Sequence, residues 1–316
     1  MIVGIDIGGT KALAVLVDPT SNLVEASVVA PSSGSGLELV ESIVNLITYL
    51  DDQTTAPIDA VGLAVAGLVT SEGSVRYSPN LPSLTEFPLR ERLSNAIGLP
   101  VVVANDATAG TIAEAEIGAG KGCKNFVFVA LGTGIGTGLV VDGHLLKGSN
   151  GFAGESGHMT INYDGDLHVT DQQGPWEMYG SGRALTHMVR QAILAGTVSL
   201  DELNVGHIDD IAGSHLVSAM ASGNKQAEGI FSQFCKDVAI GMSNLVMVVD
   251  PSLIVIGGGL ANIGSPLIEG VRDWLLKIVV GAEHRDPVRL ELSALGSDGC
   301  AIGAALLTKS LINKLS

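Results

Sequence analysis

Three glycine-rich segments of the chain have residue types that can hold phosphate groups. They are Asp6-Ile7-Gly8-Gly9-Thr10-Lys11, Leu131 to Gly138 (LGTGIGTG) and Gly257-Gly258-Gly259. Glycine lets backbone N–H groups come close to a ligand and cradle its phosphate oxygens. Asp6 stands at the end of an apolar run, where its carboxylate could hold Mg²⁺ through water, because Mg²⁺ keeps several of its waters in proteins. These residue types predict a site for a phosphate-bearing ligand with Mg²⁺.

The glycine segments also have plain structural interpretations. The first could be an ordinary hairpin turn and the third a turn from a strand to a helix, since short glycine motifs often match by chance. The second is harder to explain this way, because each glycine weakens a strand by ~0.5–1 kcal/mol relative to alanine. Its spacing is not GxGxxG, and the chain contains no GxxxxGK[ST], GxSxG or HExxH. The P-loop, simple hydrolase and zinc-protease motifs are therefore excluded, and a dinucleotide fingerprint is weak.

The apolar runs between the glycines predict the elements that position them. Strands are expected at 2–7 and 11–17, and a strand at 125–131, a glycine loop at 132–138 and a strand at 139–142 repeat that pattern. Two similar halves facing each other would suit a ligand held between them. Apolar spacing and turn residues also predict strands at 61–66, 101–104 and 253–256, and helices at 37–50, 108–117, 208–222, 225–249 and 300–312.

Composition narrows the class of protein. A length of 316 residues suggests about two domains. The net charge of −16 opposes binding to nucleic acid or to an anionic membrane. Hydrophobic residues make up 46% of the chain, enough for a large core, and the 41 glycines call for tight turns or close approaches to a ligand. The three scattered cysteines form no disulfide framework, and we find no signal peptide or membrane span, so a cytoplasmic protein is expected.

Six motifs resemble those of the ROK family of sugar kinases. They are DIGGTK at 6–11, VANDATA at 103–109, LGTGIGTG at 131–138, GFAGESGH at 151–158, GPWEMYGSGRAL at 174–185 and VIGGGL at 255–260. The likeness covers nearly the whole chain, and six motifs in order are far more specific than any one of them. Trp176-Glu177 and the residues after it are most similar to the bacterial glucokinases of that family.

The resemblance implies an α/β, two-domain actin/hexokinase-like (ribonuclease H-like) ATPase fold with an interdomain cleft. We expect each domain to contain a mixed five-stranded sheet. The small N-terminal domain should comprise residues 1–117 plus 300–316, and the large C-terminal domain residues 118–299.

The resemblance also assigns roles to individual residues. Asp106 corresponds to the general base that accepts the proton of a sugar hydroxyl, although Asn105-Asp106 could instead cap the helix that follows. The expected sugar ligands, which must pair several hydroxyls, are Asn80, Asn105, Glu155, His158 and Glu177. The expected ligands of ATP and Mg²⁺ are Asp6, Gly8, Gly9, Thr10, Lys11, Gly132, Thr133, Gly134, Gly257, Gly258 and Gly259.

The chain departs from the family at a metal site. Many ROK proteins hold a structural zinc with one histidine and three cysteines. Here His158 stands at the histidine position, but His168, Thr170 and Pro175 stand where the cysteines would be. Threonine is a poor zinc ligand, proline is none, and two histidines cannot complete a closed four-ligand site. We therefore expect no structural zinc.

Three functions compete on this resemblance. The first is an ATP-dependent hexose kinase, with glucose as the leading substrate and another hexose or an N-acetyl hexosamine as alternatives. The second is a sugar-sensing DNA-binding regulator, which the negative charge and the lack of residues before the first glycine segment oppose. The third is a sugar-binding protein that has lost turnover. Within the kinase hypothesis, polyphosphate is an alternative donor, and a homodimer or homotetramer is expected.

Overall fold

The computed structural model describes residues 1–32 and 34–311, which fall into two compact units. Unit 1 comprises Met1–Lys124, Gly138–Gly154 and the C-terminal segment from Ser293, and unit 2 comprises Asn125–Thr137 and Glu155–Leu292. The expected domain boundaries at 117 and 300 stay a prediction, and residues 312–316 of the expected small domain lie outside the described residues.

Unit 1 is built on a mixed five-stranded sheet with the strand order β3-β2-β1-β4-β7. Its strands are β1 (Ile2–Ile7), β2 (Lys11–Val17), β3 (Val24–Pro31), β4 (Ala60–Val65) and β7 (Val101–Asn105). β2 runs antiparallel to β1 and β3, whereas β1, β4 and β7 are parallel to one another. Their register places Ile7 beside Val65 and Val65 beside Asn105. The carboxyl ends of the three parallel strands therefore meet at one edge of the sheet.

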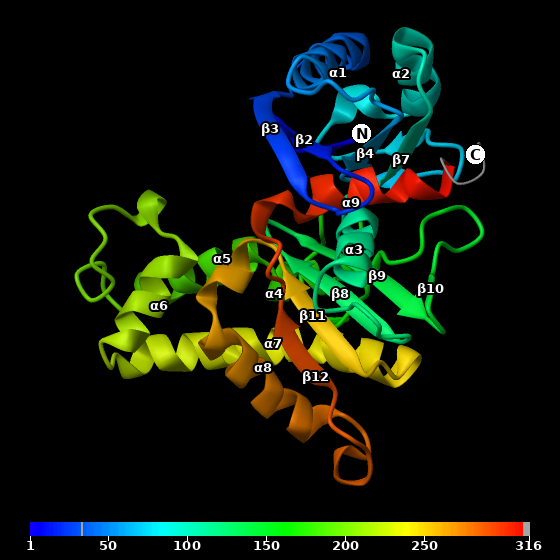
Figure 1. The fold of residues 1–316 in the computed structure, drawn as a ribbon. Coiled ribbons are helices and arrows are strands. Elements are labelled where there is room, and N and C mark those ends of the chain that lie inside the picture. Colours follow the sequence, from blue (N-terminus) through cyan, green and yellow to red (C-terminus); the bar gives the residue numbers. More distant parts are fainter. Residues whose placement is uncertain (33, 312–316) are drawn as a thin grey trace. The chain divides into compact units, whose positions relative to one another are not determined.

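Helices cover both faces of this sheet (Figure 1). They are α1 (Gly36–Asp51), α2 (Leu89–Ile97), α3 (Asp106–Glu116) and α9 (Gly299–Leu307), and a small hairpin of β5 (Leu68–Val69) and β6 (Val75–Tyr77) lies between β4 and α2 in the chain. Val3, Ile5 and Ile7 pack into one core cluster with the apolar face of α1. Ile2 packs into another cluster with α9. Because side chains alternate along a strand, Asp6 points to the α9 face.

The α9 face explains part of the glycine surplus. A Cβ on Gly4 would lie 1.9 Å from the carbonyl oxygen of Ala301, and one on Gly62 would lie 1.8 Å from that of Ala304. A Cβ on Gly303 of α9 would likewise lie 1.8 Å from the carbonyl oxygen of Ala109 in α3. These glycines let backbone pack against backbone, so they serve the fold and not a ligand.

The second sheet has the strand order β10-β9-β8-β11-β12. Its strands are β8 (Phe126–Leu131), β9 (Ile135–Val141), β10 (His144–Leu145), β11 (Leu253–Gly257) and β12 (Arg289–Leu292). β8, β11 and β12 are parallel and β10 is antiparallel to β9, so this sheet is also mixed. The helices of unit 2 are α4 (Glu177–Gly180), α5 (Gly182–Leu194), α6 (Gly213–Ala221), α7 (Lys225–Val249) and α8 (Ser265–Ile278).

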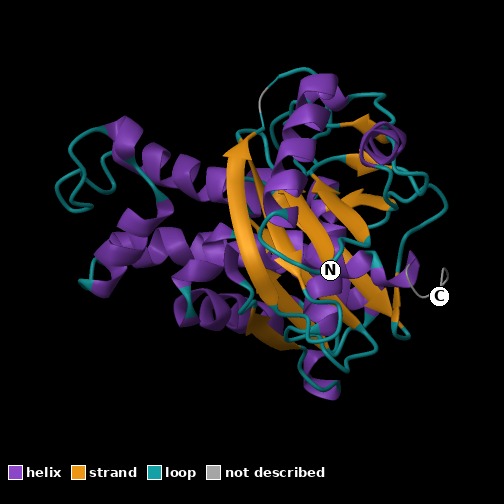
Figure 2. Ribbon diagram, turned by 45° about the horizontal axis from the view of Figure 1, so that its top comes forward, coloured by secondary structure: helices purple, strands orange, loops and turns teal. Residues whose placement is uncertain are grey.

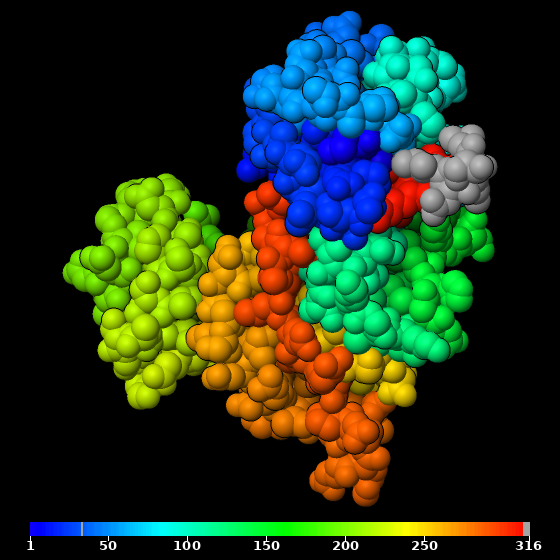
Figure 3. All heavy atoms as spheres, in the orientation of Figure 1, coloured from blue at the N-terminus to red at the C-terminus, as the bar shows by residue number. Residues whose placement is uncertain are grey.

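Helices lie outside the strands in both parts of the chain (Figure 2), and in unit 2 the segment around α6 projects from the rest of the unit (Figure 3). The expected pair of mixed five-stranded sheets is confirmed. No helix within residues 1–32 and 34–311 has the length and apolar character needed to span a membrane.

Several expected elements differ in extent, and the helix expected at 300–312 ends at Leu307. The glycine loop at 132–138 was predicted too long, because β9 already begins at Ile135. The helix expected at 208–222 covers only Gly213–Ala221, after a separate short turn at Ile208–Asp210. The helix expected from residue 108 begins at Asp106, because Asn105 supplies the cap.

Candidate active site

Two carboxylates come together at the carboxyl ends of the parallel strands in unit 1. Asp6 ends β1 with its side chain toward α9, and Asp106 follows β7 as the first residue of α3. Burial raises the pKa of Asp6 to about 7, and the negative charge of Asp106 adds to the rise while Lys11 opposes it. Burial also raises the pKa of Asp106. Because like charges disfavour ionisation, a cation beside Asp6 would offset the repulsion from Asp106.

The buried thiol of Cys300, on helix α9, lies near the same two carboxylates. Burial raises the pKa of Cys300 well above its usual value, and the charges of Asp6 and Asp106 raise it further. Cys300, in the first turn of α9, therefore lies within reach of both carboxylates and stays a protonated thiol.

Asn105, and not Asp106, caps helix α3. Its Oδ1 accepts hydrogen bonds from the backbone N–H groups of Ala107 at 2.9 Å and Thr108 at 3.2 Å. Its Nδ2 donates to the carbonyl oxygen of Gly67 at 3.1 Å. The cap that could have accounted for Asp106 is thus supplied by its neighbour, and the Asp106 carboxylate accepts a hydrogen bond from the N–H of Ala107 at 2.9 Å. A role for Asn105 as a sugar ligand stays a prediction.

The first glycine segment forms the tight turn between β1 and β2. The N–H of Gly8 donates to the carbonyl oxygen of Lys11 at 2.9 Å, and the buried hydroxyl of Ser32 donates to that of Gly8 at 2.5 Å. A Cβ on Gly9 would lie 3.1 Å from the backbone oxygen of Asn80, so Asn80 packs beside the turn. Sequence reasoning missed Ser32, because a serine in a polar loop carries no signal of its own.

The other two glycine segments meet in unit 2. β8 and β11 are parallel neighbours, with Gly257 opposite Ala130, so both segments leave the same edge of the sheet. Gly258 has φ +77°, and a Cβ there would lie 2.5 Å from the carbonyl oxygen of Leu131. The N–H of Gly182 donates to the carbonyl oxygen of Gly132 at 2.8 Å, so the start of α5 also lies against this turn.

Glu177 lies directly against the second glycine segment. Its Oε2 accepts a hydrogen bond from the N–H of Ile135 at 2.8 Å, and its Oε1 lies 3.5 Å from Nε2 of His168. A Cβ on Gly134 would lie only 2.1 Å from Glu177 Oε2. Gly134 therefore makes room for a carboxylate of the protein, and Gly138 makes room for the hydroxyl of Thr111, which would be 1.9 Å from its Cβ. Neither glycine needs a ligand to explain it.

Glu155 and His158 flank a short turn that packs on the start of β9. His158 Nε2 lies 3.9 Å from Glu155 Oε2, and its ring centroid is 5.8 Å from that of His168. The Nδ1 atom of His158 is buried without a hydrogen-bond partner among the described residues. A Cβ on Gly157 would lie 2.3 Å from the carbonyl oxygen of Ile135, so this turn and Glu177 contact the same residue of β9.

Trp176 anchors this segment to the long helix α7. The Trp176 side chain is fully buried, its Nε1 donates to the carbonyl oxygen of Asp237 at 3.1 Å, and a Cβ on Gly241 would lie 2.1 Å from its ring. The anchor places the next residue, Glu177, at the glycine turn.

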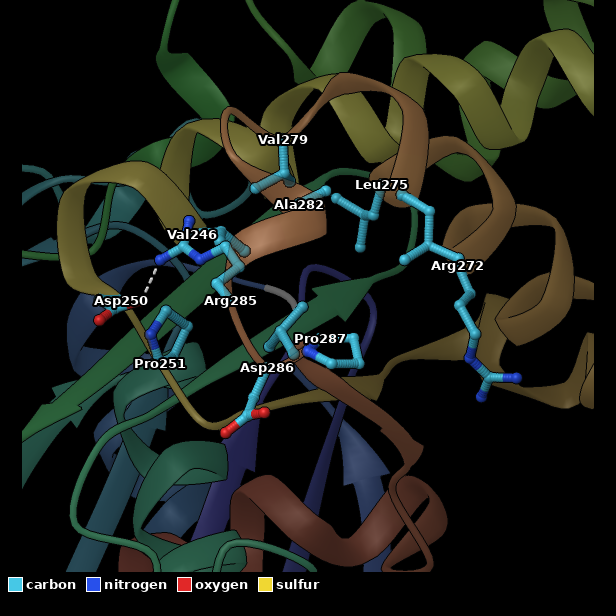
Figure 4. Close-up of a pocket in the computed structure, with 12 residues that line it drawn as sticks. Val246, Asp250, Pro251, Arg272, Leu275, Val279, Ala282, Arg285, Asp286 and Pro287 are labelled. Atoms are coloured by element: carbon cyan, nitrogen blue, oxygen red, sulfur yellow. Dashed lines mark hydrogen bonds and ion pairs between the residues drawn. The ribbon is translucent and has the colours of Figure 1, made fainter.

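A pocket elsewhere in unit 2 contains none of the expected site residues. It lies between the end of α7, α8 and the loop before β12, and it is a hollow of about 450 Å³ open to solvent (Figure 4). Arg285 pairs with Asp250 at its mouth, and Arg272 extends away from it. Its floor is apolar, with Val246, Leu275 and Val279.

Comparison with known proteins gives the same family that the motifs indicated. The family model described as ROK family matches residues 2–311. The chain belongs to the ROK family.

Two curated relatives and a solved structure show the range of the family. A glucokinase of Streptomyces coelicolor is 33% identical over 98% of this chain and 98% of its own length, and an N-acetylmannosamine kinase of Vibrio cholerae is 30% identical over 96% and 98%. Xylose repressors also match. The crystal structure of a ROK family glucokinase from Streptomyces griseus in complex with glucose and AMPPNP has a TM-score of 0.86, with 30% identity over 98% of this chain and 99% of that one. This likeness confirms the expected ROK kinase fold.

The residues at the zinc position of the ROK family do not fit a structural zinc. Nδ1 of His168 lies 2.7 Å from the hydroxyl of Thr170, and its other nitrogen, Nε2, faces Glu177 Oε1 at 3.5 Å. Pro175 offers no donor side chain, and no group of three metal-ligating side chains lies close enough together within the described ranges. The donor set is therefore two imidazoles and neighbouring carboxylates, which is not the closed Cys-rich set that structural zinc requires.

Proposed function

We propose that this protein, a sugar kinase of the ROK family, transfers the γ-phosphoryl group of ATP to a hydroxyl of a hexose, with glucose as its main substrate and glucose 6-phosphate as its product. The observation that carries this proposal is the pair Asp6 and Asp106 at the carboxyl ends of β1 and β7, two parallel strands on either side of β4, beside the glycine turn at 8–9. Such a pair supplies a proton acceptor and a cation ligand at one place, which phosphoryl transfer requires.

Asp106 is the general base of the proposed reaction. A sugar hydroxyl becomes a better nucleophile as its proton passes to a positioned carboxylate, and a base works best when its pKa lies near the working pH. Burial raises the pKa of Asp106 in that direction. Its position as the first residue of α3, directly after β7, fixes its backbone within two regular elements.

The residues of unit 1 fit a divalent cation. The pKa of Asp6 is raised by burial and by the charge of Asp106, so an ionised Asp6 is short of positive partners. Asp6 would hold Mg²⁺, directly or through water, and the cation supplies neutralisation of the phosphate charge. Backbone N–H groups of the turn at 8–11 and of the turns at 132–134 and 257–259 would receive the phosphates and the nucleoside of ATP.

Sugar recognition is assigned to Asn80, Asn105, Glu155, His158 and Glu177. Glu177 retains acceptor capacity after its bond to Ile135, because each carboxylate oxygen has two lone pairs. His158 offers Nε2 or its unpartnered Nδ1 to a hydroxyl. An N-acetyl hexosamine is the second candidate substrate, because the N-acetylmannosamine kinase of Vibrio cholerae is nearly as similar as the glucokinase.

A substrate panel tests the proposal. The purified protein with ATP and Mg²⁺ should release ADP with glucose at least ten times faster than with mannose, fructose, N-acetylglucosamine or N-acetylmannosamine. A faster rate with an N-acetyl hexosamine would move the substrate to that class. Glucose that raises the melting temperature without any ADP release would identify a binding protein without turnover. Formation of glucose 6-phosphate from polyphosphate faster than from ATP would change the donor.

The state of the protein in the cell is a further part of the proposal. We expect a cytoplasmic homodimer or homotetramer that binds small molecules and neither nucleic acid nor membrane. Light scattering of the purified protein measures its mass directly, and a mass of about 32.3 kDa would show a monomer.

A further inference from the structure

A small hairpin follows the His158 turn and presents His168. Leu167 and Gln173 pair across it as an antiparallel bridge, and the N–H of His168 donates to the carbonyl oxygen of Gln172 at 2.8 Å. Asp171 takes the left-handed conformation that closes the turn, at φ 60°. The hairpin therefore holds the backbone of His168 without any metal.

The two ring nitrogens of His168 have different neighbours. Nδ1 accepts the backbone N–H of Thr170 at 3.3 Å and also lies 2.7 Å from the Thr170 hydroxyl. That backbone group can only donate, so Nδ1 accepts and Nε2 carries the proton. The single proton of the Thr170 hydroxyl then goes to Nδ1, at 2.7 Å, and not to Gln172 Oε1, at 3.3 Å. Nε2 faces Oε1 of Glu177 at 3.5 Å, and the side chains of His168 and Glu177 are only 13% and 22% exposed. The imidazole thus links the Thr170 turn to the Glu177 carboxylate.

Glu177 is held from its other side by backbone. Its Oε2 accepts the N–H of Ile135, in the space that Gly134 leaves open. One oxygen is therefore fixed by β9 and the other is directed by His168. A carboxylate that accepts one backbone hydrogen bond and faces an imidazole nitrogen at 3.5 Å has fewer orientations open to it, which lowers the entropy lost when a hydroxyl binds.

We propose that His168 is a positioning residue that aims Glu177 at the sugar, and that the hydrogen-bonded set His168–Thr170–Gln172 does the work for which ROK relatives use zinc. The inference rests on the proposed function, in which Glu177 accepts a sugar hydroxyl. It also gives a reason for the residues at two of the lost cysteine positions. His168 supplies a donor to Glu177, and Thr170 fixes which of its nitrogens is that donor.

Kinetics of three single variants test the positioning role. His168→Leu removes the donor, His168→Gln keeps an N–H donor at the position of Nε2, and His207→Leu is the matched control. His207 forms an exposed pair with Asp209, with 3.3 Å between Nδ1 and Oδ2, far along the chain from Glu177. We expect His168→Leu to raise the KM for glucose about 3- to 10-fold, with kcat and the KM for ATP within about twofold of wild type. His168→Gln should recover most of the loss, and His207→Leu should change nothing.

A double variant tests whether His168 acts through Glu177. In the Glu177→Ala background, His168→Leu should add less than about twofold to the KM for glucose, because the group it positions is gone. Full additivity of the two effects would overturn the proposal. An equal fall in kcat for His168→Leu and His168→Gln, with a lower melting temperature in both, would also overturn it in favour of a purely structural role.

One readout needs no turnover. The amide resonance of Ile135 in ¹⁵N NMR reports its hydrogen bond to Glu177 Oε2. It should shift in His168→Leu, recover in His168→Gln and stay unchanged in His207→Leu. If no sugar of the panel supports ADP release, the proposed function fails. The Ile135 resonance would still show whether His168 positions Glu177. An Ile135 amide that is the same in all four proteins would contradict the link.

Discussion

Units 1 and 2 place their candidate carboxylates by different means. In unit 1, strand register sets the positions of Asp6 and Asp106, and close glycine packing of α9 on β1 and β4 leaves the strands little freedom. In unit 2, Glu155 stands in irregular chain and Glu177 begins the single turn of α4. The hydrogen bond from Ile135 and the buried Trp176 beside it set the position of Glu177. A group set by strand register is hard to move without changing the fold. A group set by side chains can be changed one residue at a time, which suits substrate recognition.

The electrostatic surroundings of the two carboxylate sets also differ. In unit 1 burial raises the pKa values of both aspartates, and the charge of Asp106 raises that of Asp6 further. In unit 2 Glu177 has an N–H donor at one oxygen and an imidazole at the other. The first pair is therefore suited to take up a proton or a cation, and the second to accept hydrogen bonds from neutral hydroxyls.

The largest expected effect comes from Asp106→Asn. The amide keeps the shape of the side chain and the cap on α3 comes from Asn105, so the fold and glucose binding should persist. Loss of the base should lower kcat by ~10²- to 10⁴-fold. Stopped-flow measurement of ADP release checks the rate, and calorimetry checks glucose binding. Glu116→Gln, an exposed substitution in the same helix, is the control and should keep full activity.

The pH dependence of the reaction should follow the same residue. Because burial raises the pKa of Asp106, kcat should fall with decreasing pH at a higher pH than an ordinary aspartate would give. A plateau that extends down to pH 4 would assign the proton to another group.

The next effect in size comes from Glu177→Ala. It removes an acceptor for one or two sugar hydroxyls, so the KM for glucose should rise about 10- to 150-fold while kcat changes less. Steady-state kinetics at saturating ATP measure both constants. Glu283→Ala, an exposed substitution in the same unit, should leave them unchanged. A loss of kcat as large as that of Asp106→Asn would contradict the division of roles between Asp106, as the base, and Glu177, as a sugar ligand.

A stability effect of opposite sign to most carboxylate substitutions is expected for Asp6→Asn. The folded pKa of about 7 lies above the ordinary value of 3.8, so between these values the native state binds more protons than the unfolded state. The wild type should therefore lose stability as pH rises through this window, by an amount on the order of 4 kcal/mol from Asp6. Asp6→Asn should lose less, because of the two aspartates only Asp106 then keeps a raised pKa.

Urea unfolding without Mg²⁺ at pH 4.5 and pH 8 measures this difference. Asp18→Asn is the matched control, because hydrogen bonds from Thr20 and Ser21 lower the pKa of the exposed Asp18. Its stabilising contribution is present at high pH and lost as pH falls, so this substitution should destabilise at pH 8. If the free energy of unfolding changed equally with pH in the wild type and in Asp6→Asn, Asp6 would not have the raised pKa that its burial implies.

The smallest expected effect is that of a zinc chelator. Elemental analysis should find less than one zinc per chain, and a zinc-selective chelator should leave glucose phosphorylation unchanged in excess Mg²⁺. One tightly bound zinc per chain, whose removal lowers the melting temperature, would show that the side chains around His158 and His168 hold metal after all.

The sequence predicted best those site residues whose positions are set by the backbone of regular strands. The motifs around Asp6 and Asn105-Asp106 lie at strand ends that apolar periodicity already predicted, and the two mixed sheets followed from the family resemblance. The roles of glycines were predicted least well. Gly4, Gly62 and Gly303 pack backbone against backbone, and Gly134 faces Glu177, which no local pattern reveals because each partner is distant in the chain.

The same limit applied to His168. The sequence showed only that it replaces a cysteine, whereas its link to Glu177 depends on a hairpin between them. Ser32 was missed for a similar reason, since its hydrogen bond to Gly8 joins residues 24 positions apart. Contacts that one side chain makes across irregular chain leave no periodic signal.

The central claim is that the strand-end carboxylate of unit 1 performs the chemistry while the side-chain-held carboxylate of unit 2 selects the sugar. A crystal structure of the protein with glucose, Mg²⁺ and a non-hydrolysable ATP analogue tests it most directly. We predict a carboxylate oxygen of Asp106 within ~3 Å of the accepting hydroxyl, and Glu177 bonded to a different hydroxyl while still accepting the N–H of Ile135. An accepting hydroxyl that faces Glu177 or Glu155, with Asp106 turned away from the sugar, would contradict the claim.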